Sequence, residues 1–79
     1  MKYLVIELQT ATDGTVANLV YQFDTRNEAE SKYHYILSFA AVSELPYYSA
    51  MIVTSFGETI ASAYYDHTPE PEEEPEETN

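Results

Sequence analysis

Apolar and polar residues alternate in two segments at the start of the chain. Residues 3–9 and residues 16–23 each change character at every second position. Alternation with a period of two is typical of β-strands whose two faces meet different surroundings. Between the segments, Asp13-Gly14 is a pair that favours the positive φ angles of tight turns. The pattern therefore predicts a β-hairpin.

A helical pattern follows the hairpin. Thr25 and Glu28 have the spacing of a capping box, a common start of a helix. From Arg26 to about Val42, apolar residues recur every three or four positions, as they do along one face of a helix. Pro46 ends the pattern, because the residue before a proline is disfavoured in the α conformation. The predicted buried stripe consists of Ala29, Tyr33, Ile36, Leu37 and Ala40.

Two further strands complete the predicted domain. Residues 47–56 are rich in β-branched and aromatic side chains, and residues 59–65 follow after a short turn. The order ββαββ over residues 1–67 predicts an α+β domain, a four-stranded antiparallel sheet with one helix packed on one face. The pattern leaves the order of the strands in the sheet open.

One helix covers only one face of such a sheet. We expect the other face to be more apolar than a solvated sheet face normally is. A domain of this size buries only about 60% of its unfolded surface, so homodimerisation or a partner protein would stabilise it. The residues expected on this second face are Tyr3, Val5 and Val20 and, depending on the register, Met51, Val53 and Tyr65.

The helix carries a second apolar group opposite its predicted buried stripe. Tyr35, Phe39 and Val42 are spaced by four and three residues, at positions where exposed helices usually carry charge. These side chains either bind a partner or lie under a loop or a terminus of the chain.

Eight tyrosines are the most distinctive feature of the composition. The pairs Tyr47-Tyr48 and Tyr64-Tyr65 place one ring on each face of a strand. Tyrosine is favoured at interfaces because it buries a large ring and keeps a hydroxyl for hydrogen bonding, although it also fills small cores. The candidate interaction residues are Tyr3, Tyr35, Phe39, Val42, Tyr47 and Tyr65.

Acidic residues outnumber basic ones by fourteen to three, for a formal net charge of -11. Residues 68–79 combine six glutamates with three prolines and no hydrophobic residue, which predicts a disordered tail that either solubilises the domain or competes for a basic groove. Nucleic acids and anionic membranes attract clustered Lys and Arg, so we expect neither to be bound directly. The apolar run at residues 3–6 is too short for a signal peptide or a membrane span, which favours a cytoplasmic location.

No grouping of residues predicts catalysis. Cysteine is absent, and the two glycines are both explained by turns, which leaves no phosphate-binding loop. Ser38 and Ser43 lack the spacing to a base and an acid that nucleophilic catalysis needs. His34 is expected at the half-buried flank of the helix, and Asp66 with Glu70 has no fixed geometry for a cation. We therefore expect no enzyme, no cofactor and no metal.

Four segments carry a resemblance to a known family. KYLVIE (residues 2–7), DGTV (13–16), NEAESKYH (27–34) and AAVS (40–43) resemble a family of short acidic hypothetical proteins from phages and prophages of gut Firmicutes. The resemblance spans residues 1 to about 65, and because the family has no assigned function it implies no catalytic or binding residue. It implies a mobile-element context, in which small acidic proteins often bind host or phage proteins.

These features together favour a non-enzymatic, phage-type binding protein that forms a homodimer. In the most concrete form of this hypothesis it inhibits a host defence or nucleic-acid-handling protein, and its acidic side chains occupy a basic groove in place of phosphates. Two alternatives stay open. The chain could sequester a nucleotide signal, with Arg26 or Lys32 neutralising the phosphate, or it could be an accessory protein of the virion or its assembly.

Overall fold

The computed structural model describes residues 1–68 and confirms the predicted ββαββ order. The predicted strand boundaries agree with the structure to within two residues. The elements are β1 (Tyr3–Thr10), β2 (Val16–Phe23), α1 (Arg26–Ala40), β3 (Tyr47–Thr54) and β4 (Thr59–Asp66). The predicted tail, residues 68–79, lies outside the described residues except for Thr68.

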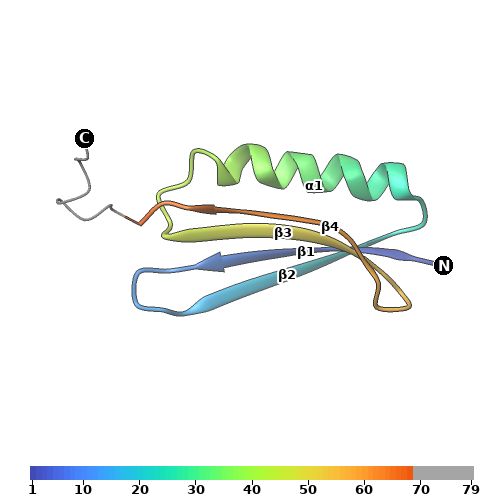
Figure 1. The fold of residues 1–79 in the computed structure, drawn as a ribbon, viewed down its shortest axis with the longest axis horizontal. Coiled ribbons are helices and arrows are strands. Elements are labelled where there is room, and N and C mark those ends of the chain that lie inside the picture. The colour runs from blue at the N-terminus through green and yellow to red at the C-terminus, as the bar shows by residue number, and fades with distance from the viewer. Residues whose placement is uncertain (69–79) are drawn as a thin grey trace, which may run out of the picture.

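The four strands form one antiparallel sheet in the order β2-β1-β3-β4. The helix connects β2 to β3 and lies across one face of the sheet, as Figure 1 shows. Within residues 1–68 no second layer covers the other face. The predicted α+β class is thus confirmed, and the structure supplies the strand order that the sequence left open.

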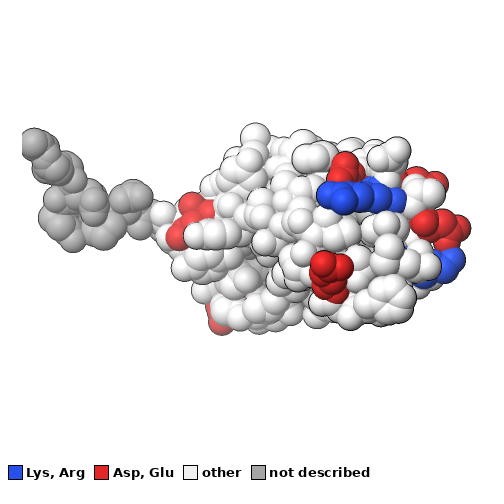
Figure 2. Space-filling view, turned by 45° about the vertical axis from the view of Figure 1, so that its right-hand side comes forward, with Lys and Arg blue, Asp and Glu red and all other residues white. Residues whose placement is uncertain are grey.

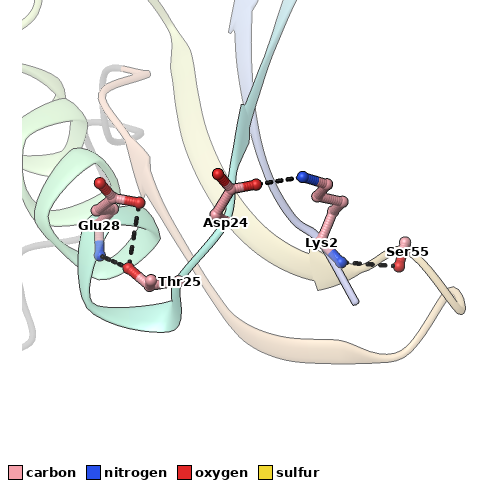
Figure 3. Close-up of polar contacts among 5 residues, drawn as sticks. All are labelled: Lys2, Asp24, Thr25, Glu28 and Ser55. Atoms are coloured by element: carbon pink, nitrogen blue, oxygen red, sulfur yellow. Dashed lines mark hydrogen bonds and ion pairs between the residues drawn. The ribbon is translucent and has the colours of Figure 1, made fainter.

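The start of the helix matches the capping pattern (Figure 3). Thr25 has an extended backbone, and its Oγ1 accepts a hydrogen bond of 3.2 Å from the backbone N–H of Glu28. Nearby, Lys2 forms an ion pair with Asp24, and its backbone N–H donates to Ser55 Oγ at 3.0 Å. These contacts fasten the start of β1 to the chain segments that follow β2 and β3.

The core lies between the helix and the sheet. Four residues of the predicted helix stripe are buried, and Leu37 packs partly buried against them. The sheet contributes Val5, Ala50 and Ile52, of which Val5 and Ile52 have no exposed surface. The buried stripe of the helix is therefore confirmed. The buried helix residues are Ala29, Tyr33, Ile36 and Ala40.

The prediction for the uncovered sheet face was partly wrong. Val5 pairs with Tyr21 and with Ile52, and all three lie on the helix-facing side, where Val5 and Ile52 are buried. Because strand side chains alternate, Tyr3 shares this side with Val5. Tyr65 also lies there, since it pairs with Tyr48, which packs against the core.

Leu4, Ile6 and Leu8 occupy the uncovered face instead of Tyr3 and Val5. Val20 and Met51 lie there as expected, because both pair with Ile6, and Val53 lies there because it pairs with Leu4. The reason for the error is that alternation separates a strand into two faces, but the long-range register decides which of them meets the helix.

Candidate interaction surfaces

An apolar surface extends over the uncovered side of the sheet. We call it the outer sheet face, and its central members come from β1, β2 and β3. Cross-strand pairing places Ile6 between Val20 and Met51, with further apolar side chains on either side. Among the described strand residues on this face, Asp66 at one corner is the one that carries charge. The apolar residues of the outer sheet face are Leu4, Ile6, Leu8, Val16, Val20, Tyr47, Met51, Val53 and Tyr64, and its neutral polar residues include Thr10, Asn18, Gln22, Ser49 and Ser62.

Several of these side chains are widely open to solvent. Val20 is 57% exposed and Tyr64 71% exposed, whereas Leu4, Ile6 and Leu8 are half-buried by their neighbours in the sheet. An uncharged face with this many exposed apolar side chains on a small domain marks an interaction site. The outer sheet face is therefore the first candidate binding surface.

The second candidate surface is the group formed by Tyr35, Phe39 and Val42, which we call the helix stripe. All three side chains are exposed, so no loop or terminus among residues 1–68 covers them. The rings of Tyr35 and Phe39 meet edge to face, with centroids 4.9 Å apart and an interplanar angle of 83°. This contact fixes two aromatic rings side by side on the helix surface.

The six residues proposed from the sequence as an interaction site do not form one surface. The helix stripe holds three of them, and Tyr47 lies on the outer sheet face. Tyr3 packs against the core, and Tyr65 lies on the helix-facing side, where its ring stacks on His67 at 6.0 Å between centroids. Sequence reasoning missed Leu4, Ile6 and Leu8, because it assigned the opposite side of β1 to the uncovered face.

Three acidic residues lie at one end of the molecule, away from the ion pairs of Lys2 and Arg26. Asp13, Glu44 and Asp66 are all exposed. Asp13 and Glu44 follow the ends of β1 and α1, and Asp66 is the last residue of β4, where it pairs with Tyr47. We call these three residues the acidic end. In Figure 2 the basic side chains lie toward the right-hand end of the visible surface, whereas acidic side chains also occur at its left-hand end.

Hydrogen bonds keep two carboxylates of the acidic end ionised. The backbone N–H of Thr15 donates to Asp13 Oδ1 at 2.9 Å and lowers the pKa of that carboxyl group. Thr68 donates to Asp66 Oδ1 through its hydroxyl at 2.6 Å and its backbone N–H at 3.0 Å, which lowers the pKa of Asp66. Asp13 and Asp66 are thus charged at neutral pH.

The three basic residues all lie against acids or rings. Lys2 pairs with Asp24, and Arg26 Nε donates to Glu30 Oε2 at 2.8 Å. Lys32 Nζ lies 4.2 Å from the ring centroid of Tyr21 and 5.3 Å from that of Tyr35. Lys32 also lines a shallow hollow of about 360 Å³ between α1 and β2. The hollow is lined by Phe23, Glu28, Ser31, Lys32 and Tyr35.

A buried carboxylate lies beneath the helix. Glu7 is 7% exposed on the helix-facing side of β1, and it accepts hydrogen bonds from the hydroxyls of Tyr48 and Tyr21, the latter at 3.2 Å. Gln9 Nε2 donates to Glu7 at 2.9 Å and to the Tyr48 hydroxyl at 3.1 Å. Glu7 takes part in neither of the two ion pairs among the described residues. The hydrogen-bond donors that it contacts there are therefore all neutral. We call Glu7, Gln9, Tyr21 and Tyr48 the Glu7 cluster.

Tyr48 is expected to ionise late in an alkaline titration. Burial, together with its hydrogen bond to Glu7 and the charge of that carboxylate, raises the pKa of Tyr48 to about 12. This value exceeds the ordinary tyrosine pKa of 10.0. The protonated hydroxyl of Tyr48 therefore stabilises the folded state fully below pH 10, and this stabilisation is lost as the pH rises toward about 12. Burial also raises the pKa values of Tyr21 and Tyr33, so Tyr48→Phe should remove the last phase of the tyrosinate titration, near pH 12, rather than every late phase. Tyr64→Phe should leave that last phase in place, and a phase near pH 12 that survives Tyr48→Phe unchanged would contradict the assignment.

The two histidines take different positions. His34 is exposed, with its ring edge to face against Tyr33 at 5.2 Å, so the expected half-buried position was wrong. The reason is that its neighbour Tyr33 fills the buried position. His67 joins the end of β4 to the helix, because its Nε2 donates to the Ala40 carbonyl at 2.7 Å. Its backbone N–H donates to the Pro46 carbonyl at 2.7 Å.

Residues 1–68 contain no group of three or more His, Cys, Asp or Glu side chains placed to hold a metal ion. Glu70, which was considered together with Asp66, lies outside these residues. In the same part of the chain, no helix has the length and apolar character needed to cross a membrane.

The fold and its surfaces define a small α+β domain with two exposed apolar surfaces and one acidic end. No family model, curated protein or solved structure matches the chain. The resemblance to acidic phage proteins therefore stays a prediction, as does the cytoplasmic location.

Proposed function

We propose that this chain is a non-enzymatic binding protein that recognises another protein through the helix stripe and the adjoining acidic end. The observation that carries the proposal is the exposure of Tyr35, Phe39 and Val42, which are 57%, 51% and 78% exposed. Aromatic side chains of this kind supply most of the affinity in many protein interfaces. The Tyr35–Phe39 contact also restricts both rings before binding, which reduces the entropy lost on association.

The acidic end suits a partner with a basic groove. Glu44 follows Val42 by two residues, so the helix stripe leads directly into the acidic end. The sequence adds six glutamates after residue 68. Complementary charge accelerates association and suppresses wrong partners. In the phage context, the favoured partner is a host defence or nucleic-acid-handling protein, whose groove would accept carboxylates in place of phosphates.

The proposal is tested by capturing partners from a bacterial lysate on the immobilised full-length chain. We expect a captured protein to be released by salt and by excess duplex DNA, because both compete for a basic groove. Phe39→Ser should weaken capture at least tenfold. Phe56→Ser is the matched control, since Phe56 is 82% exposed in the turn between β3 and β4, away from the helix stripe.

Two outcomes would count against this function. Capture that is insensitive to salt and DNA would exclude the basic groove, and equal effects of the two phenylalanine variants would exclude the helix stripe.

The nucleotide alternative has less support from the geometry. A phosphate in the hollow beside Lys32 would meet the carboxylate of Glu28, and Arg26 is already paired with Glu30. A thermal-shift screen against nucleotides tests this alternative, because a tight ligand raises the melting temperature by mass action. No feature of the described residues favours a virion role over the binding role.

A further inference from the structure

On the central strand β1 the two sides differ in a way that is the reverse of normal burial, although the helix-facing side of the sheet as a whole holds the core. On β1 the helix-facing side carries Glu7 and Gln9 beside Val5, whereas the outer sheet face carries Leu4, Ile6 and Leu8. An antiparallel sheet with one solvated side usually places its polar residues on that side. Here the more apolar side of the central strand is the one without a covering layer among residues 1–68.

The remaining segment of the chain is unsuited to cover the outer sheet face. Residues 69–79 contain only Pro, Glu, Thr and Asn, so they offer no hydrophobic side chain to bury there. A basic partner is also a poor fit, because Asp66 at the corner is the one charged residue among the described strand positions of this face. The occupant must itself present an apolar, uncharged surface.

We propose that a second copy of this chain packs against the outer sheet face, so that two sheets form the inner layers of a dimer and the two helices lie outside. Two copies with a net charge of -11 each repel one another over most of their surface. The outer sheet face brings the chains together with little opposing charge. A two-fold axis makes such a patch self-complementary, since each copy contributes the same residues.

The size of the face fits a specific dimer. Strands of eight residues in a four-stranded sheet span roughly 500 Å² in projection, from a rise of about 3.3 Å per residue and a strand spacing of about 4.8 Å. Two copies would therefore cover roughly 1,000 Å² in projection, and more in accessible surface because side chains protrude, which reaches the range of specific interfaces. Sheets packed in this way lie about 10 Å apart.

The competing arrangement is pairing along an edge strand. β2 is at one edge of the sheet and contains no charged residue or proline, the usual features that prevent edge pairing. Edge pairing would leave the outer sheet face uncovered. The two arrangements therefore predict that substitutions at different residues disrupt the dimer. Met51 lies on the interior strand β3, whereas Leu19 lies on β2 and points to the helix-facing side with Glu7.

The test measures the oligomeric state of the full-length chain by sedimentation at micromolar to millimolar concentration. We expect a dimer that Met51→Lys weakens more than tenfold, because each interface would then bury two unpaired ammonium groups. Leu19→Lys is the matched control and should leave the dimer intact. Leu19 is 47% exposed, so a lysine is tolerated at that position.

A second variant guards against misfolding of Met51→Lys. Val20→Lys introduces the same charge on the outer sheet face at a position that is 57% exposed, and it too should dissociate the dimer while circular dichroism stays unchanged. A wild-type chain that is monomeric at millimolar concentration would overturn the inference. So would a dimer that Leu19→Lys dissociates and Met51→Lys does not, which would indicate edge pairing. Partner capture through the helix stripe is independent of these outcomes.

Discussion

Replacing Ile52 with alanine is expected to lower the free energy of unfolding by about 2–5 kcal/mol, the usual range for truncating a buried isoleucine. Ile52 has no exposed surface, pairs with Val5, and packs in the cluster beneath the helix. The cost combines lost apolar burial with the cavity left behind. A typical domain has a total stability of only about 5–15 kcal/mol, so the midpoint of urea unfolding should fall sharply.

Ile6→Ala is the matched control for this prediction. It makes the same change on the adjacent strand β1, but Ile6 is half-buried and faces away from the helix. Measured at a protein concentration low enough to exclude association, it should cost clearly less than Ile52→Ala. Equal losses would contradict the assignment of the two sheet faces.

The elements of the fold could be predicted because their signals are local. The capping pair Thr25 and Glu28 lies within one helical turn, and the buried stripe of α1 follows from spacings of three and four residues. The strand order and register depend on contacts between distant segments, such as the pairing of Val5 with Ile52. No local pattern specifies those contacts, so the face of β1 that meets the helix was assigned incorrectly.

The same distinction separates the surfaces that were predicted from those that were missed. The helix stripe was found because Tyr35 and Phe39 lie one turn apart on a single helix and Val42 follows two residues after its end. The Glu7 cluster was missed because its residues come from β1, β2 and β3 and meet only in the correct register. A glutamate among apolar neighbours was the one available signal in the sequence, and nothing local to it indicates a pair of tyrosine hydroxyls.

The Glu7 cluster should make a large contribution to stability at neutral pH. Hydrogen bonds to a charged group contribute about 1.5–3 kcal/mol each, and removing a donor leaves the buried carboxylate partly unsatisfied. The double substitution Tyr21→Phe with Tyr48→Phe removes both hydroxyl donors and leaves Gln9 as the one remaining donor seen in the structure. We expect the free energy of unfolding in urea at neutral pH to fall by about 1.5–3 kcal/mol, mainly through the loss of the Tyr48 hydroxyl, because Tyr21 is the more exposed of the two donors.

A further substitution distinguishes two causes for this loss of stability: an unsatisfied Glu7 carboxylate, or disrupted packing of the tyrosine rings. Adding Glu7→Leu to the two phenylalanine substitutions removes the carboxylate together with its hydroxyl donors, and replacing all partners by apolar groups is much less costly than leaving one of them unpaired. The triple variant should therefore recover stability relative to the double variant. Glu7→Leu in the wild-type background should destabilise, because it leaves both half-buried tyrosine hydroxyls without their acceptor. If the triple variant were as unstable as the double one, the tyrosines would stabilise the core by packing rather than by satisfying Glu7.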